Sequence, residues 1–292
     1  MSLFWQCLVD SLLLGGLYSL MSIGLSLGFG VTRIINFAHG EMIMFGAYGA
    51  YFGSVLLGVD PLLSLPLVAI LVAVTAAVVF KALIEKVLDA PHINQILLLF
   101  GISLALQNVA AILWTGDARS VSTPYSLTAF EFEALLVPHG RVIAFATAVV
   151  LIVALFCWLR FSELGRATRA VAENGQAATL MGINVSRMYM LSFGINAALG
   201  AATGAISAFL LTITPFMGFH MLIKAFAIVV LGGLGSVTGT ILGAFALAFA
   251  ETWVSYYVPE GNGWAEGVAF VVLLCVLIIR PKGILGQAVA VH

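Results

Sequence analysis

Long apolar runs with very few charged residues, separated by short polar stretches, dominate the chain. An α-helix needs about 20 predominantly apolar residues to span the hydrocarbon core of a bilayer. Most of the runs approach that length, but the run 221–234 is short, and the Gly-rich stretch "LGGLGSVTG" joins it to the next one. The pattern predicts a bundle of eight or nine membrane-spanning helices with at least one broken helix, in these segments: 8–31, 42–59, 62–80, 96–115, 142–159, 188–213, 221–234, 236–257 and 265–279.

Composition supports an integral membrane protein. Of the 292 residues, 62% are hydrophobic and only 9% are charged, and the mean hydropathy is +1.14. Soluble domains carry about a quarter charged residues, so this chain has too little polar surface to cover a globule in water. No linker or low-complexity segment divides it, which favours one all-α membrane domain over 1–292. The N-terminus lacks the basic region of a cleaved signal peptide, so we expect the first helix to be retained.

Lysine and arginine residues concentrate in three connections. Four Arg residues occupy the loop 160–187, two Lys residues occupy 81–95, and the C-terminal tail carries Arg280 and Lys282. Cytoplasmic loops are enriched in Lys and Arg. With nine crossings all three segments face the cytoplasm, the N-terminus lies outside and the connection 116–141 faces outward. With eight crossings one terminus changes sides.

Polar residues cluster in the stretch "RIINFAHGEM", residues 33–42, between two uncharged runs. Irregular backbone inside a bilayer persists only where protein or water satisfies it, and transporters break helices beside the substrate path in this way. Asn36 is an acceptable N-cap and Gly40 permits a kink. The alternative is an interfacial turn whose polar side chains face water, and the residues alone do not favour either.

Two further polar groups lie inside the runs. Gln107 and Asn108 fall past the middle of the fourth run, where amides should face other helices or a cavity. In the sixth run, Asn196 and Thr203 belong to one helical stripe of small and polar residues. The stripe could line a hydrophilic path, but a tight seam between two helices is slightly favoured.

Charged residues within the later runs have ordinary explanations. Lys224 is best read as a lysine that extends to the interface, and Glu251 could lie near the outer membrane surface. Charges at the centre of a bilayer are rare unless they are paired. Together with Glu41 and His220, these residues are the ionisable groups to examine.

The loop 160–187 is the most polar long stretch of the chain. It should form a helix from about Glu163 to Met181, closed by Gly182. Because Gly175 interrupts this helix, two short helices are the alternative. Its end, "LMGINV", exposes apolar side chains in a polar frame, which is typical of a docking site. An amphipathic loop resting on the membrane surface is the alternative.

Motifs for chemistry on the chain itself are lacking in the sequence. There is no phosphate-binding loop, no HExxH and no CxxC, and the "GLSLG" match to a hydrolase elbow lies within a span. The three cysteines suggest neither a metal site nor a disulfide framework. We therefore expect no enzymatic activity, no metal and no cofactor in this chain. An intramembrane enzyme is the least favoured class, and a self-sufficient secondary transporter or channel, using Glu41 and Glu251, is the main alternative.

Several motifs in the same order resemble one known family. They are "INFAHGEMIMFGAY", "GISLALQNVAAILW", "AVAENGQAATLMGINVSR", "AIVVLGGLGSVTGTILGA" and "LIIRPKGILG". Together they are similar to the LivH-type permeases of branched-chain amino acid ABC transporters, over nearly the full chain. The resemblance implies an importer subunit in the bacterial inner membrane that transports branched-chain amino acids or a related small polar or carboxylate solute.

The resemblance also implies partners and roles. The partners are a second permease of LivM type, two ATPase subunits that hold the ATP, and a periplasmic substrate-binding protein; nucleic acid is not expected. The loop 160–187 resembles the segment that the ATPases contact, which points to Glu173, Asn174, Leu180, Met181, Gly182 and Ile183. Candidates for the translocation path combine the segment 36–41 with polar positions inside the spans: Asn36, Phe37, His39, Glu41, Gln107, Asn108, Asn196 and Thr203.

Overall fold

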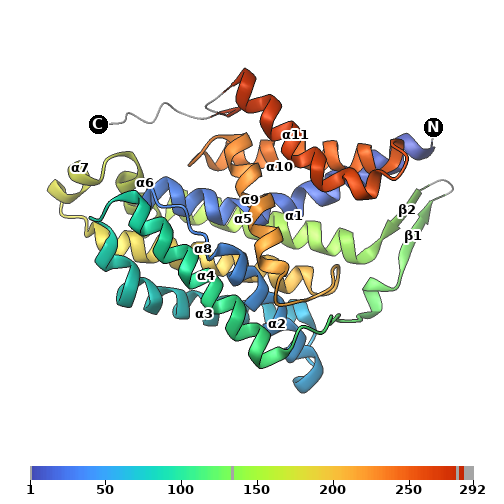
Figure 1. Cartoon of the computed structure of the whole chain (residues 1–292), viewed down its shortest axis with the longest axis horizontal. Helices are drawn as coiled ribbons and strands as arrows, with labels where there is room; N and C mark the ends of the chain where they lie inside the picture. Colours follow the sequence, from blue (N-terminus) through green and yellow to red (C-terminus); the bar gives the residue numbers. More distant parts are fainter. Residues whose placement is uncertain (1, 133–134, 281–282, 286–292) are drawn as a thin grey trace.

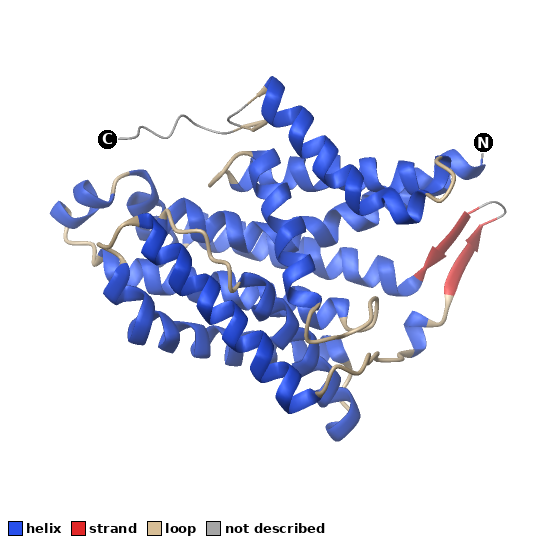
Figure 2. Cartoon of the chain, viewed as in Figure 1, coloured by secondary structure: helices blue, strands red, loops and turns tan. Residues whose placement is uncertain are grey.

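The computed structural model describes residues 2–132, 135–280 and 283–285, and these form a helical bundle with one small β-hairpin (Figures 1 and 2). The helices are α1 (Ser2–Thr32), α2 (His39–Leu57), α3 (Pro61–Val79), α4 (His92–Trp114), α5 (His139–Phe161), α6 (Glu163–Glu173), α7 (Gly175–Leu180), α8 (Val185–Ser207), α9 (Met217–Gly232), α10 (Val237–Tyr257) and α11 (Gly261–Ile279). A π-turn at Phe80–Ile84 and 3₁₀ turns at Glu85–Val87 and Pro124–Ser126 complete the helical elements. Strands β1 (Ala129–Phe132) and β2 (Leu135–Pro138) pair antiparallel.

Each predicted apolar segment coincides with one helix. The longer of these helices run between two ends of the molecule, whereas α2 and α9 begin within the bundle (Figure 1). We call them the α6–α7 end and the hairpin end, the latter defined by β1 and β2. At the α6–α7 end, Arg33 donates from Nη2 to the Ala172 carbonyl over 3.2 Å, and Ile284 N–H donates to Leu231 over 2.9 Å. The predicted basic residue Lys282 lies outside the described residues.

The connection between α4 and α5 folds over the hairpin end. Tyr125 donates to the Asp60 carboxylate at the start of α3 over 3.0 Å. Burial and that carboxylate raise the pKa of Tyr125 to about 12, so the phenol stays protonated and keeps donating. Arg119 pairs by backbone hydrogen bonds with Ile213, which ties the same connection to the loop after α8. Hydrogen bonds therefore hold this connection against the start of α3 and the loop after α8 at the hairpin end.

Six helical segments of the described chain are long and apolar enough to cross a membrane: Leu3–Thr32, Pro61–Val87, His92–Trp114, His139–Phe161, Val185–Ser207 and Val237–Tyr257. Shorter apolar helices occur at Met217–Gly232 and Gly267–Ile279. The outer helices α3, α4 and α5 leave most of their side chains on the surface, whereas α1 and α8 are largely buried. The expected all-α membrane bundle is confirmed, with six crossings supported by length and composition.

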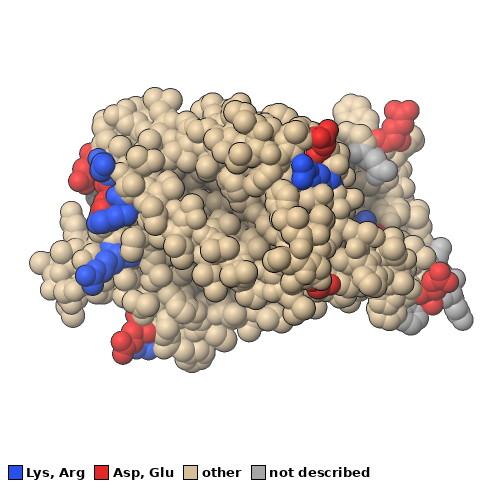
Figure 3. All heavy atoms as spheres, turned by 90° about the horizontal axis from the view of Figure 1, so that it is seen from below, with Lys and Arg blue, Asp and Glu red and all other residues tan. Residues whose placement is uncertain are grey.

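Charged side chains follow the same division. On the face shown in Figure 3, Lys and Arg side chains gather at the α6–α7 end, and a band without charged side chains separates them from those toward the hairpin end. Such a band matches the apolar layer of a bilayer, where a charge costs about 2.5–3.5 kcal/mol on insertion scales. The distribution supports the predicted common side for the basic connections.

The polar stretch after α1 returns into the bundle rather than lying on its surface. His39, the first residue of α2, places Nε2 2.8 Å from the Met21 carbonyl of α1. Met21 precedes the end of α1 by about three turns, or roughly 16 Å, a distance that the six residues 33–38 can cover when extended. Asn36 and His39 are 3% and 0% exposed, so the interfacial turn is wrong for this stretch.

Local hydrogen bonds hold the returning segment. Arg33 adopts a left-handed conformation with φ 58°, which turns the chain back at the end of α1. Asn36 is not the N-cap: that position is Ala38, which has no side chain to cap the helix. Instead Asn36 accepts the Ala38 N–H with Oδ1 over 3.1 Å, an Asx-turn that leads into α2.

Glycines allow α2 to pack directly on the backbone of α8. A Cβ at Gly204 would lie 1.9 Å from the Ile43 carbonyl oxygen, and one at Gly46 would lie 2.1 Å from that of Ala201. Small residues at such contacts let helix backbones approach within a membrane. The backbone of α8 therefore leaves no room for side chains at this seam.

Replacement of Gly204 should destabilise the bundle. We expect Gly204→Ala to cost about 1–3 kcal/mol or more, because the new methyl group meets backbone that cannot rotate away. Gly101→Ala on α4 is the matched control, since a Cβ there meets no atom within 4 Å. Melting temperatures in detergent should fall for the Gly204 variant and hold or rise for the Gly101 variant. Equal melting temperatures would contradict the tight seam.

Candidate functional site

A cavity of about 630 Å³ lies between α1, α5, α8, α9 and α10. It extends from the mouth residues Asp10, Arg141 and Tyr256, toward the hairpin end, to Met21 and Lys224 inside the bundle. Pockets of roughly 300–1,000 Å³ are typical of small-molecule sites. The cavity therefore has the size for one small solute and the position for a path into the bundle.

The inner wall of the cavity carries a cluster that joins three helices. Tyr18 of α1 donates to Glu251 Oε2 of α10 over 2.5 Å, and Lys224 of α9 donates to the Tyr18 hydroxyl over 3.1 Å. Lys224 Nζ also lies 3.4 Å from Glu251 Oε2. Glu251 is 4% exposed, so its charge is matched within the protein. We call these three residues the inner cluster.

The inner cluster differs from the sequence-based interpretation. Lys224 does not extend to the membrane surface, and Glu251 is buried against two other helices rather than at an interface. The signal was present in the sequence, because a lysine and a glutamate in neighbouring apolar runs can cancel each other's cost by pairing. Tyr18, which bridges them, gave no signal of its own within a uniformly apolar run.

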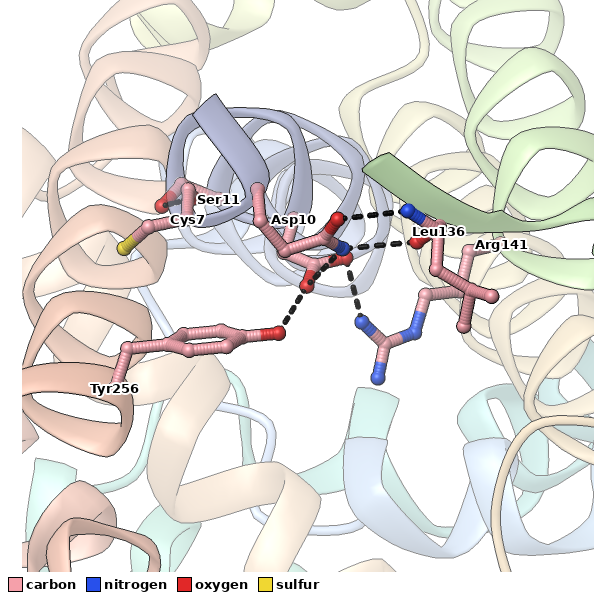
Figure 4. A network of polar contacts seen from close by, with 7 residues as sticks. Cys7, Asp10, Ser11, Leu136, Arg141 and Tyr256 are labelled. Atoms are coloured by element: carbon pink, nitrogen blue, oxygen red, sulfur yellow. Dashed lines mark hydrogen bonds and ion pairs between the residues drawn. The ribbon is translucent and has the colours of Figure 1, made fainter. Parts of the chain in front are cut away.

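A second polar network lies at the mouth of the cavity (Figure 4). Asp10 accepts from Arg141 Nη1 over 2.8 Å and from the Tyr256 hydroxyl over 2.6 Å. Gln6 donates to Asp10 over 3.1 Å, and its side-chain amide also donates to the Leu136 carbonyl of β2 and accepts from the Leu136 N–H. Because the Arg141 side chain is 51% exposed, its ion pair adds little stability, and the network serves mainly to position α1, α5, α10 and the hairpin.

The floor of the cavity adjoins the start of α2. Met21 lines the cavity with its side chain, while its carbonyl lies against His39. Thr203 also lines the cavity, about one turn along α8 from Gly200, where a Cβ would lie 3.1 Å from the His39 ring. The returning segment and α8 together separate the cavity from the α6–α7 end.

Two helix N-termini meet at this floor. A Cβ at Gly40 of α2 would lie 2.0 Å from the Gly218 carbonyl oxygen of α9, so the first turns of the two helices touch. Glu41 is 1% exposed there and accepts from Ser103 of α4 through Oε1 over 3.1 Å. Helix N-termini carry positive partial charge, which stabilises an acidic side chain beside them. This is one reason why an acidic side chain occupies an otherwise apolar region.

The other candidate path residues divide between the cavity, its surroundings and the lipid face. Thr203 lines the cavity, whereas Asn196 packs its amide against Gly24 and Gly28 of α1, so the stripe on α8 is partly a wall and partly a seam. Phe37 contacts Phe100 edge to face, with ring centroids 6.2 Å apart.

The two amides of α4 lie away from the cavity. Gln107 is only partly buried and does not line the cavity. Asn108 is exposed and does not line the cavity, so within the described chain its amide faces neither another helix nor the cavity. Its amide donates to the Leu104 carbonyl of its own helix over 2.7 Å, which satisfies the group without a neighbouring element.

The polar loop forms two short helices, which is the alternative that the interruption at Gly175 left open, instead of one helix. Asn174 separates α6 from α7 in an extended conformation and caps α7 by accepting the Ala177 N–H over 3.0 Å. Gly182 takes the left-handed conformation expected after a helix, with φ 81°. Glu173, at the end of α6, is exposed.

The apolar residues of this loop do not form one surface. Leu180 and Met181 are 89% and 82% exposed, whereas Ile183 packs against the core. The candidate docking surface therefore narrows to Leu180 and Met181, which we call the apolar tip. Exposed apolar groups of this kind mark contact sites for other molecules.

The fold and the cavity define a polytopic helical membrane protein with an internal site that is walled off from one of its ends. The chain belongs to the family described as "Branched-chain amino acid transport system / permease component", whose model matches residues 7–277. It is 33% identical to the high-affinity branched-chain amino acid transport system permease LivH of Salmonella typhimurium, over 97% of this chain and 96% of that protein.

Other relatives span a similar share. The permease BraD of Pseudomonas aeruginosa is 34% identical over 97% of this chain and 96% of its own length. A probable LivH of Methanocaldococcus jannaschii is 26% identical over 96% and 91%. Among solved structures, a chain of PsaBC from Streptococcus pneumoniae in complex with Fab matches with a TM-score of 0.53 at 13% identity, covering 94% of this chain and 92% of that one, which shows a shared fold.

Reversal of the charge at Glu41 should disrupt the floor. Glu41→Lys places a buried cation against two positive helix termini, and we expect a loss of about 3 kcal/mol or more in stability. Glu41→Gln retains an acceptor for Ser103 and should cost much less. Glu163→Lys, in the exposed first turn of α6, is the matched control with a small effect. Thermal unfolding in detergent measures the stability of the three variants. Similar losses of stability for Glu41→Lys and Glu163→Lys would contradict the prediction.

Proposed function

We propose that this chain is a membrane-spanning subunit of an ABC importer that carries branched-chain amino acids or a related small polar or carboxylate solute. The apolar tip is the observation that carries the proposal: Leu180 and Met181 are almost fully exposed at the end of a polar, arginine-rich segment. A subunit that hydrolyses no ATP itself needs such a contact to receive force from its ATPases. Family membership and the names of the relatives support the substrate class.

The proposal includes the remaining subunits. Two ATPase subunits, which hold the ATP, contact the apolar tip and its neighbours Glu173, Asn174, Gly182 and Ile183. A second permease of LivM type lies beside this chain, and a periplasmic binding protein delivers solute at the hairpin end. No cofactor resides in this chain. The complex lies in the bacterial inner membrane.

We further propose that eight or nine helices cross or enter that membrane. The alternating course of the long helices supports nine, with the N-terminus and hairpin outside and α6 and α7 in the cytoplasm. On this arrangement the cavity opens outward and its floor, formed around His39 and Glu41, is the barrier that must open. Asn36, Phe37, Asn196 and Thr203 surround the same barrier.

The contact between Arg33 and Ala172 connects the apolar-tip segment to this floor. Arg33 begins the returning segment, and Ala172 lies in the last turn of α6. Closure of the ATPases moves α6 and α7, and Arg33 transmits that movement to residues 33–38. Alternating access then follows from displacement of α2 relative to α9.

Two measurements test the proposal. Tagged chain, purified in mild detergent from its native cells, should recover P-loop ATPases and a second permease, identified by mass spectrometry. Cells that lack the chain should lose high-affinity uptake of radiolabelled L-leucine and regain it on complementation. A single purified chain that transports L-leucine without ATPases would refute the assignment.

A charge on the apolar tip should prevent assembly. We expect Met181→Glu to abolish recovery of the ATPases while the chain still folds, because an exposed side chain contributes little to the fold. Gln176→Glu adds the same charge at another exposed position of α7 and is the matched control. Ile183→Asp should instead destabilise the chain, since Ile183 packs against the core. Normal recovery of ATPases with Met181→Glu would rule out the tip as their docking site.

A further inference from the structure

We propose that the inner cluster of Tyr18, Lys224 and Glu251 binds the ammonium and carboxylate groups of a zwitterionic amino acid, with its apolar side chain held by the aliphatic wall of the cavity. The inference deepens the proposed function, on which it rests for the presence of a transported solute. It assigns the solute class to particular atoms of this chain.

The geometry of the ion pair favours exchange with a ligand. Charge-assisted N–H···O bonds are usually about 2.7–2.9 Å long, whereas Lys224 Nζ and Glu251 Oε2 are 3.4 Å apart. An ammonium group has three donors, and the described residues supply Lys224 with two acceptors, Tyr18 and Glu251. Lys224 also lines the cavity. Its ammonium therefore retains donor capacity for a carboxylate that arrives from the cavity.

A zwitterion can replace this long contact with two better ones. The ligand carboxylate accepts from Lys224 while the ligand ammonium donates to Glu251, and Tyr18 keeps its contact with the Glu251 carboxylate. No charge is left unpaired on either side of the exchange. A ligand with one of the two charged groups would separate Lys224 from Glu251 and leave one of them without its partner, which is costly in a buried site.

The balance of charge in the whole cavity selects for the same class. Two carboxylates and two cations line it, as two pairs: Asp10 with Arg141 at the mouth, and Glu251 with Lys224 inside. Asp10 is already held by Tyr256 and Gln6 as well as Arg141. The inner pair is thus the less constrained one, and the lining, apart from His220, has no net charge. A net-neutral ligand preserves that balance.

The remaining wall is suited to an aliphatic side chain. Its apolar members come from α1, α5, α9 and the turn after α8: Leu13, Leu14, Leu17, Met21, Ala144, Leu210, Leu211 and Met221. Burying apolar surface contributes about 25 cal/mol per Å². An aliphatic amino acid matches both halves of the cavity, whereas a polar side chain would lose its hydration without gaining partners on the aliphatic side.

A cysteine inside the cavity can report occupancy. The full chain would carry Met221→Cys, with the native Cys7, Cys157 and Cys275 replaced by alanine. The rate of alkylation by a water-soluble maleimide would be measured with L-leucine, with 4-methylpentanoate, which lacks the ammonium group, and with 3-methylbutylamine, which lacks the carboxylate. Leu180→Cys at the apolar tip is the control site, where labelling should not respond to any ligand. We expect L-leucine to protect position 221 at least about tenfold more effectively than either half-molecule.

Variants of the cluster should change selectivity, not only affinity. Glu251→Gln removes the partner of the ligand ammonium, so L-leucine should protect no better than 4-methylpentanoate. With Lys224→Met, the protection of position 221 by L-leucine should fall to the level given by 3-methylbutylamine. Tyr257→Phe, next to the mouth but outside the cavity lining, should leave the selectivity unchanged. If a charge variant does not fold, Tyr18→Phe tests the same site, because it keeps both charges and should weaken L-leucine protection without changing the order of the ligands.

The outcomes separate this inference from the proposed function. Absence of protection by L-leucine, equal protection by the half-molecules, or unaltered selectivity in Glu251→Gln and Lys224→Met would overturn the zwitterion site. The function would still stand if the chain restores L-leucine uptake and recovers ATPases. Protection with the predicted selectivity, in a chain that supports no uptake, would support the site and refute the function.

Discussion

A polar group that enters the apolar band of this bundle has no water to turn to, so it must be satisfied from within the protein. This constraint explains the arrangement of the interior. The segment 33–38 leaves helical structure where residues of α1, α4, α8 and the turn Phe80–Ile84 pack around it. Asn36 folds back on Ala38, His39 contacts the Met21 carbonyl and Glu41 lies beside the first turns of two helices. The close approach of the helices at glycine contacts keeps the segment 33–38 tightly packed within the bundle.

The same constraint explains how the charged residues of the cavity are arranged. Its charged residues occur as pairs on different helices, at the mouth and near the floor, so each pair depends on the relative position of the helices that carry it. The mouth pair is supported by Gln6 and Tyr256 and by contact with the hairpin. The inner pair lies on α9 and α10, with α1 between them through Tyr18. A displacement of α9 would therefore alter the inner pair first.

Much of the fold could be predicted from the sequence, because long apolar runs indicate membrane-spanning helices. The nine runs match nine helices of the described chain, and Gly182 takes the left-handed conformation expected of a glycine that closes a helix. The residues that meet across the bundle were not predictable in the same way. Lys224 and Glu251 each had an ordinary explanation when taken alone, and only the packing of α9 against α10 brings them together. Asn108 is exposed within this chain, and its amide N–H donates to its own helix. The split between Leu180 and Ile183, one exposed and one in the core, likewise depends on how α7 docks against α8.

The apolar tip has a consequence for the life of the chain before it is assembled. Leu180 and Met181 project almost completely from the surface, where water must order around them. A newly inserted chain without partners therefore carries an exposed apolar patch that other unfolded or unassembled proteins can contact. Excess copies would aggregate or be degraded, so the number of stable chains in a cell would follow the supply of the molecules that cover the tip. The exposure of these two side chains therefore favours synthesis of the chain in step with the molecules that cover the tip.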